Sequence, residues 1–199
     1  MIRASSTFEA RAAFSAHRTL AAFFLAVALA GGLGACAPLP VDPDGTRLDA
    51  NTGTTLTLMP RPVELIVDRT RGPKSDPFAY LAPFETNRMG SHELFLWVSA
   101  PQVAGPLDVP QVFCGDELIK LETVKDDLAA FGLSRPPYAL PAPWSVQWYF
   151  KLSGEVLDCF ARAARLRVVT QAGEAEPDKY TAEAAALSGV GSFVTRVRT

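Results

Sequence analysis

Alternation of apolar and polar residues sets the fold class of this chain. The clearest case is Ser145–Leu152, in which every second residue from Val146 onward is apolar. A period of two is typical of a strand with one buried face. Weaker versions of the same pattern predict six further strands, at Thr55–Leu58, Val63–Val67, Val109–Cys114, Leu118–Leu121, Leu166–Thr170 and Phe193–Val197.

Two other patterns complete the predicted fold. Leu94–Val98 is apolar on both faces, as expected for a central strand that is covered on two sides. Gly154–Ala164 has apolar residues at helical spacing after Ser153, which is suited to cap the helix. A second short helix is predicted around Val124–Phe131, ended by Gly132. We therefore expect a mainly β, sandwich-like fold with one or two short helices, with an α+β sheet as the alternative.

The N-terminal segment is predicted to be an export signal. A basic stretch ending at Arg18 precedes eleven uncharged apolar residues, Leu20–Ala30, and small residues follow. As a helix, eleven residues would reach only about 16 Å, roughly half of the ~30 Å hydrocarbon core of a bilayer. The segment is therefore too short for a permanent span, and we expect residues 1–35 to be removed.

The four residues Leu33-Gly34-Ala35-Cys36 resemble the lipobox of bacterial lipoproteins. The resemblance implies cleavage before Cys36 and attachment of a diacylglyceryl group to its sulfur. Because two or three acyl chains hold a protein stably on a membrane, it also implies a lasting lipid anchor. By the sorting rule of the family, Ala37 after the cysteine favours the outer membrane, with the protein facing the periplasm.

The rest of the chain divides into a tether and one domain. Residues 36–53 are rich in Pro, Gly and Asn, which predicts a flexible tether behind the lipidated cysteine. Residues 54–199 are predicted to form a single β-rich globular domain. Two long connections, Asp68–Gly90 and Ser134–Pro143, interrupt it, and loops of this length are often functional or mobile.

Charge excludes one class of partner. Residues 1–35 hold three arginines and one glutamate, so their removal leaves 16 basic and 20 acidic residues of the 19 and 21 in the whole chain. A mildly acidic domain without a run of Lys or Arg lacks the feature that attracts a phosphate backbone. Nucleic acid is therefore not expected as a partner.

The cysteines that remain suggest a disulfide. If Cys36 carries lipid, Cys114 and Cys159 form an even pair, and such pairs are commonly bonded in an oxidising compartment. Two separate buried thiols are the alternative, because spacing alone does not bring the two Cα atoms within bonding range.

No catalytic, metal-binding or cofactor-binding residues are predicted. His92 is the only histidine after the signal; a zinc site with Cys114 and Cys159 lacks ligand-like spacing, and a hydrolase lacks the G-x-S-x-G motif. A glycan hydrolase would need two carboxylates across a cleft. The acids considered for that role are Asp116, Glu117, Asp126 and Asp127, for which a solvated face is the default interpretation.

Two groups of residues are candidates for binding. Tyr138, Trp144 and Tyr149 are predicted to form an exposed aromatic platform for sugar or peptide, unless Trp144 packs against the core edge. Four arginines occupy outward-facing positions of two predicted strands. If the strands are neighbours, the arginines would form a basic stripe that could bind anionic lipid or polymer, unless nearby acids neutralise it. The four arginines are Arg165, Arg167, Arg196 and Arg198.

Three functions follow from these patterns. The first is a non-enzymatic, lipid-anchored binding or assembly module for an envelope protein or glycan. The second is a carboxylate-based envelope hydrolase acting on glycan, and the third is a structural linker between membrane and partner. The single histidine and the absence of a catalytic motif favour the binding module; the sequence predicts neither its ligand nor its oligomeric state.

Overall fold

The computed structural model describes residues 45–68, 77–102, 105–125 and 127–198. The predicted signal peptide, the lipidation residue Cys36 and Asp126 lie outside these residues. Within them the chain forms eleven strands and four helical segments. The strands are β1 (Thr46–Asp49), β2 (Thr54–Leu58), β3 (Val63–Val67), β4 (Phe78–Arg88), β5 (Ser91–Pro101), β6 (Gln111–Cys114), β7 (Glu117–Ile119), β8 (Glu122–Val124), β9 (Ser145–Lys151), β10 (Arg165–Thr170) and β11 (Asp178–Glu183). The helices are η1 (Leu128–Phe131), α2 (Gly154–Arg162), η2 (Ala184–Leu187) and α3 (Ser188–Val197).

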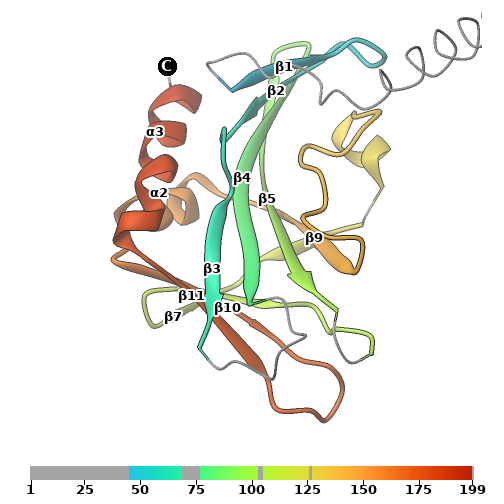
Figure 1. Ribbon diagram of the computed structural model, residues 1–199. Coiled ribbons are helices and arrows are strands. Elements are labelled where there is room, and N and C mark those ends of the chain that lie inside the picture. The colour runs from blue at the N-terminus through green and yellow to red at the C-terminus, as the bar shows by residue number, and fades with distance from the viewer. Residues whose placement is uncertain (1–44, 69–76, 103–104, 126, 199) are drawn as a thin grey trace, which may run out of the picture. The chain divides into compact units, whose positions relative to one another are not determined.

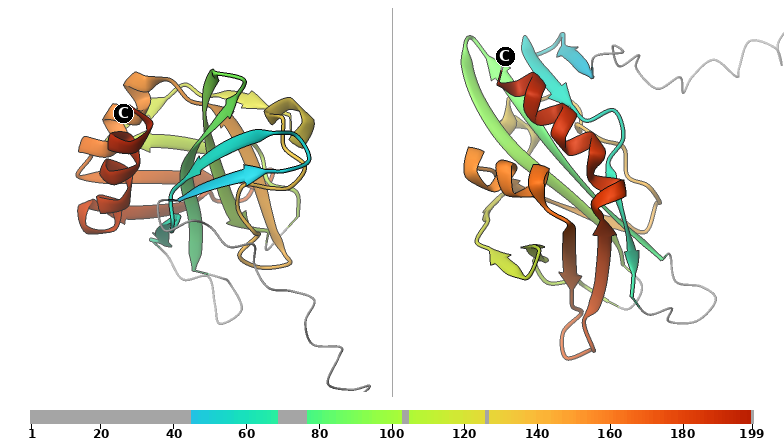
Figure 2. Two further views of the ribbon diagram at one scale, coloured as in Figure 1. Left: turned by 90° about the horizontal axis from the view of Figure 1, so that it is seen from above. Right: turned by 90° about the vertical axis from the view of Figure 1, so that its left-hand side faces the viewer.

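All the strands belong to one antiparallel sheet, which curls on itself (Figures 1 and 2). Its order is β7-β6-β10-β11-β3-β4-β5-β9-β8. The two outermost strands, β7 and β8, are consecutive in the chain and separated only by Lys120 and Leu121. Because three peptide steps span at most about 11 Å, the two edges of the sheet lie close together. The prediction of a mainly β fold with short helices is confirmed.

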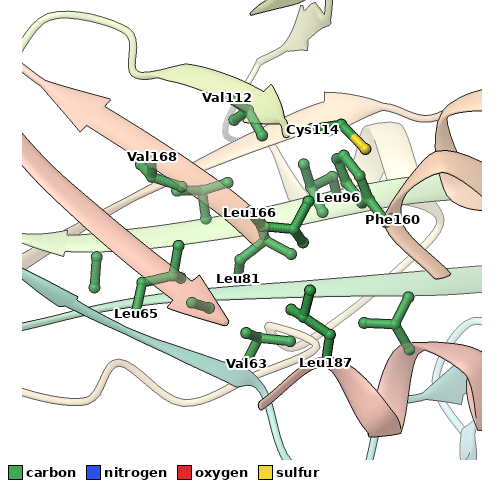
Figure 3. Packing of buried hydrophobic residues seen from close by; sticks show 14 of the residues in the cluster. Val63, Leu65, Leu81, Leu96, Val112, Cys114, Phe160, Leu166, Val168 and Leu187 are labelled. Carbon is green, nitrogen blue, oxygen red and sulfur yellow. The ribbon is translucent and has the colours of Figure 1, made fainter. Parts of the chain in front are cut away.

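The inner face of the curled sheet holds the larger core. Alternate residues of the strands point inward, and α2 and α3 pack over them with Phe160 and Phe193. Figure 3 shows part of this cluster, in which β3, β4, β5, β6 and β10 each contribute side chains. The labelled members are Val63, Leu65, Leu81, Leu96, Val112, Cys114, Phe160, Leu166, Val168 and Leu187.

A second, aromatic core lies on the outer face of β4, β5 and β9. Phe84, Phe95 and Tyr149 point outward from these strands and contact Phe131 of η1 at ring-centroid distances of 4.9–6.1 Å. Residues 127–144 cover this half of the face, with Phe131, Leu133 and Tyr138 packed into the cluster. Leu94–Val98 is therefore covered on both sides, as predicted.

Strand β4 changes its partner halfway along. Its first half pairs with β3 and its second half with β2, and Pro83 lies at the junction between the two registers. Proline cannot donate a hydrogen bond, so a place where the neighbouring strand is interrupted suits it. The hydroxyl of Tyr138 fills the junction, donating to the Pro83 carbonyl at 3.2 Å and accepting from the Met59 amide at 2.9 Å.

Several predicted elements need correction. Phe193–Val197 is part of helix α3 and not a strand: its β-branched residues mimic alternation, but Val190, Phe193, Val194 and Val197 have helical spacing and face the core. The second half of the predicted connection Asp68–Gly90 is strand β4. It was not recognised as a strand because it contains Pro83 and ends in polar residues.

Two boundaries also shift. Of the helix expected at Val124–Phe131, only the short η1 forms, capped by Gly132 with φ 66°. The predicted tether, residues 36–53, contains β1, because Asn51 and Gly53 make the turn of a β1–β2 hairpin and do not continue a linker.

Candidate functional site

The outer face of β7, β6, β10, β11 and β3 is not covered by residues 127–144. One row of residues crosses this half of the sheet, each paired with the next across neighbouring strands. The row runs Leu118, Phe113, Arg167, Thr181, Ile66 and Phe78. None of its four apolar members belongs to either core cluster. We refer to this row as the open face.

The open face contains two exposed apolar residues, and its other apolar members, Phe113 and Phe78, are half-buried. Ile66 is 57% exposed and Leu118 is 47% exposed, although each lies in a strand whose neighbours point into a core. Exposed apolar residues are ordinary when scattered singly, but Ile66 and Leu118 belong to one row with the half-buried Phe113, and a contiguous apolar surface is typical of a binding site. Only Ile66 could have indicated this face from the sequence, because it is apolar at a position of β3 where alternation predicts an outward, polar residue.

Arg167 is the only charged side chain in the open face. Its guanidinium lies 4.4 Å from the ring centroid of Phe113, a cation–π distance. No ion pair to Arg167 forms within the described parts of the chain. A guanidinium that lies over an aromatic ring keeps N–H donors that suit a carboxylate; the neighbouring Thr181 hydroxyl donates to Asp68 at 3.0 Å.

The predicted basic stripe does not form, because only two of its four arginines lie on a strand. Arg165 and Arg167 are both on β10, and Arg165 is bound to Asp116 at 2.7 Å. Arg196 is on α3 and donates to the Leu58 carbonyl at 3.0 Å, while Arg198 follows the helix and pairs with Asp158. Three of the four cations are thus used within the domain.

The predicted aromatic platform is also divided. Tyr149 is fully buried, because β8 and β5 flank β9 and residues 127–144 cover its outer side. The ring of Tyr138 lies against that of Trp97, with 5.0 Å between the ring centroids. Burial raises the pKa of the Tyr138 hydroxyl, which is hydrogen-bonded to the Met59 amide and the Pro83 carbonyl. Trp144 alone is exposed, at 58%. Its exposure contradicts packing against the core edge, but no three-residue platform exists.

Cys114 and Cys159 form a disulfide, as predicted. Their Cα atoms lie 6.4 Å apart, and the bond links β6 to α2 across 45 residues. Both side chains border the inner core. The bond therefore fastens the helix that covers the inner face to β6, the strand that contributes Phe113 to the open face.

A polar cluster surrounds His92, the second residue of β5. The Nδ1 atom of His92 lies 2.9 Å from Oε1 of the buried Glu85, whose other oxygen accepts from Thr57 at 3.2 Å. The Nε2 atom lies 3.1 Å from the amide nitrogen of Asn87. Both ring nitrogens of His92 are thus engaged, and none of these bonds involves a serine or cysteine nucleophile. The arrangement orients the imidazole but does not assemble a hydrolytic triad.

The three acids considered for glycan cleavage that the structure describes are engaged separately or exposed. Asp116 is paired with Arg165, Glu117 is exposed on β7, and Asp127 caps η1 by accepting from the Ala129 amide at 3.0 Å. Elsewhere, hydrogen bonding to Arg198 holds the pKa of Asp158 below its ordinary value. A lowered pKa keeps a carboxyl ionised, which is the opposite of what a general acid requires.

Asp49 fastens the β1–β2 hairpin to the aromatic cover. Its buried carboxylate accepts from the amide of Ser134 at 2.6 Å, from the Ser134 hydroxyl at 2.8 Å and from the Asn51 amide at 3.1 Å. Burial alone would raise the pKa of Asp49, but these hydrogen bonds outweigh it and the pKa is lowered. Thr54 adds a hydrogen bond to the Gly132 carbonyl at 2.7 Å.

Other kinds of site are not seen in the part of the chain that the structure describes. No three His, Cys, Asp or Glu side chains gather there in a way that would hold a metal ion. None of the helices in that part has the length and apolar character needed to cross a membrane. No protein-family model, curated protein or solved structure matches the chain, so a functional proposal depends on the residues described above.

Proposed function

We propose that this protein is a lipid-anchored envelope protein that acts as a non-enzymatic binding module. In this proposal Cys36 carries the lipid, the chain lies on the periplasmic side of the outer membrane, and the open face binds a protein partner. The partner would present apolar side chains around a carboxylate, which complements Ile66, Phe113 and Arg167.

Two features support an exported, anchored protein. The segment Leu33-Gly34-Ala35-Cys36 has the lipobox pattern behind an apolar export signal. The disulfide between Cys114 and Cys159 is a bond that persists in oxidising compartments such as the periplasm and is rare in the cytosol. The two features are independent, because one depends on targeting residues and the other on the folded domain.

The open face is the observation that carries the binding function. Its four apolar residues lie outside both cores, and its single cation has no ion pair in the described residues. Folding of the domain gains little from leaving this surface exposed, whereas binding would bury apolar area and pair a charge in one step.

The anchor is tested by Cys36→Ser. We expect the wild-type protein to incorporate a fatty-acid analogue during growth and the variant to lose all label and remain uncleaved. Cys114→Ser is the matched control, since it also replaces a cysteine by serine, here one of the disulfide, but should keep the label. Equal labelling of wild type and Cys36→Ser would refute the anchor.

The binding face is tested by photo-crosslinking in the cell. A photoreactive amino acid at Ile66 should give a discrete adduct that weakens at least tenfold when Arg167→Glu is added. The same group at Glu155, an exposed residue on α2, is the control and should not give that adduct. An adduct that forms equally from both positions, or that ignores Arg167→Glu, would remove the open face as the binding surface.

A further inference from the structure

One end of the domain brings together the entry of the chain, two turns and a group of arginines. The first described residue is Gly45, directly before β1, and the Leu58 amide donates to its carbonyl at 2.7 Å. The β1–β2 hairpin and the β4–β5 turn lie at this same end of the sheet (Figures 1 and 2). The pairing agrees, since Leu48 pairs with Thr55 and Thr55 with Asn87. We call this the hairpin end.

The hairpin end exposes two large apolar side chains. Met89, at the tip of the β4–β5 turn, is 99% exposed, and Leu48 on β1 is 63% exposed. Met89 also has a φ of 53°, in the left-handed region that residues other than Gly rarely adopt. The turn is held by Asn87, whose side-chain oxygen accepts from the Gly90 amide at 3.0 Å. The backbone thus presents the methionine at its most protruding position.

Three arginines lie at this end, on the side of the sheet that residues 127–144 cover, whereas Leu48 points to the other side of β1. Arg47 donates to the Pro136 carbonyl at 3.0 Å, Arg135 is adjacent to that proline and exposed, and Arg88 packs beside Gly132. A Cβ added at Gly132 would lie 3.4 Å from Cδ of Arg88, an ordinary contact distance, so the arginine side chain passes directly beside this residue. All three cations therefore lie along one loop.

The nearby acids make their hydrogen bonds and ion pairs with groups other than these three arginines, although the charge of Asp49 also acts on Arg47. The Asp49 carboxylate is turned inward to Ser134, Glu85 binds His92 and Thr57, and Glu93 lies 3.8 Å from Lys151. None of the three arginines has an ion pair among the described residues. Exposed apolar tips at the same end as cations suit the interface of an anionic bilayer, where each basic residue near the surface adds about fivefold to binding.

The length of chain between Cys36 and Gly45 limits how far the domain can lie from the membrane, and the hairpin end is the end closer to where this chain enters. Nine residue steps span at most about 30 Å when fully extended. Gly45 lies beside Leu58 and Phe84, only four residues from Arg88 along β4 but six from Phe78. At about 3.3 Å per residue, the hairpin end is the nearer end.

We infer that the hairpin end rests on the membrane surface, with Met89 and Leu48 in the headgroup region and Arg47, Arg88 and Arg135 against anionic headgroups such as phosphatidylglycerol. This inference rests on the proposed lipid anchor. It makes the anchored domain sit in one orientation, so the open face is held at the side of the molecule where a partner can reach it.

The test measures the depth of single labelled positions in the lipidated protein on vesicles. Met89→Cys and Glu174→Cys each receive an environment-sensitive fluorophore; Glu174 is exposed in the β10–β11 turn. On vesicles with 30% phosphatidylglycerol we expect the label at position 89 to shift to the blue and to be quenched at least twofold by a nitroxide in the headgroup region. The label at position 174 should change by less than a tenth.

Charge variants separate headgroup binding from simple proximity. Arg88→Glu with Arg135→Glu should remove at least half of the shift at position 89 while thermal unfolding stays as in wild type. Arg162→Glu, an exposed arginine on α2, is the control and should leave the shift unchanged. Equal behaviour of positions 89 and 174 on protein that floats with the vesicles would overturn the inference, as would insensitivity to the paired charge reversal. Protein that does not float with the vesicles at all would instead contradict the proposed anchor.

Discussion

The outer face of this sheet has two halves that obey the same alternation but differ in cover. Over β4, β5 and β9 the outward side chains include Phe84, Phe95 and Trp97, and residues 127–144 bury them. Over β6, β10, β11 and β3 the outward row mixes apolar residues with Arg167 and Thr181, and it meets solvent. Among the residues that the structure describes, a covering segment lies only over the half that is almost wholly aromatic.

This difference shows which exposed apolar residues call for a functional explanation. Each Å² of buried apolar surface contributes about 25 cal/mol, so a second cover over Ile66, Phe113 and Leu118 would stabilise the domain. No described segment provides one. A row that remains apolar without contributing to either core is better explained by a partner than by folding.

The largest effect that tests the comparison is Phe131→Ala, set against Phe113→Ala. Phe131 is buried in the cover and contacts Phe84, Phe95 and Tyr149, so its loss should lower the free energy of unfolding by about 3–5 kcal/mol. Phe113 lies in the open face, and its loss should cost about 1 kcal/mol. Chemical denaturation of both variants checks this, and equal costs would mean that the two halves are not differently covered.

The second effect concerns the hydroxyl that joins the cover to β4. Tyr138→Phe keeps the ring but removes the partner of the Met59 amide and the Pro83 carbonyl. Leaving buried polar groups without partners should cost about 1–3 kcal/mol. Trp144→Phe, at an exposed position of the same loop, is the control and should cost less than about 0.5 kcal/mol. Thermal unfolding of the pair separates the two, and a tolerant Tyr138→Phe would show that the junction is filled by something else.

Much of this arrangement could be predicted from the sequence, because local alternation requires no knowledge of neighbours. Strands β3 and β9, the α2 helix after Ser153 and the doubly covered Leu94–Val98 are of this kind. Strand β4 was not predicted, since Pro83 is tolerated only where β2 and β3 meet, and that meeting place depends on tertiary structure.

The candidate site could be predicted only in part. Arg167 points outward from its strand, as expected. Its role, however, depends on Phe113, which lies 54 positions away in sequence and pairs with it on the neighbouring strand. The order β6-β10-β11-β3 places Ile66 in the same row, and no local pattern reveals such an order. Tyr149 was assigned to solvent for the same reason, because its strand is buried by segments that alternation does not show.

A third test uses pH to probe how Asp49 holds the cover in place. Hydrogen bonds lower the pKa of Asp49 in the folded state, so its contribution to stability is fully present above the unfolded pKa and is lost as pH falls through the folded pKa. Asp49→Asn should therefore be less stable than wild type by about 1–2 kcal/mol at pH 7, and the difference should shrink in acid. Unfolding curves from pH 7 down to pH 2 measure it, with Asp116→Asn as the exposed control. A difference that did not change with pH would show that charge on Asp49 is not what holds Ser134.

The smallest expected effect on stability is the most informative about the open face. Leu65 and Ile66 are adjacent on β3 but point to opposite sides of the sheet, the first fully buried and the second mostly exposed. Threonine keeps the β-branch that suits a strand, so Ile66→Thr should change the free energy of unfolding by less than about 0.5 kcal/mol. Leu65→Thr should cost about 3 kcal/mol, because it leaves a void and buries a hydroxyl. A stable Ile66→Thr variant can then carry a photoreactive group at Leu118, and a weaker adduct than in wild type would assign Ile66 to binding; an unchanged adduct, or a loss of stability as large as that of Leu65→Thr, would assign it to folding.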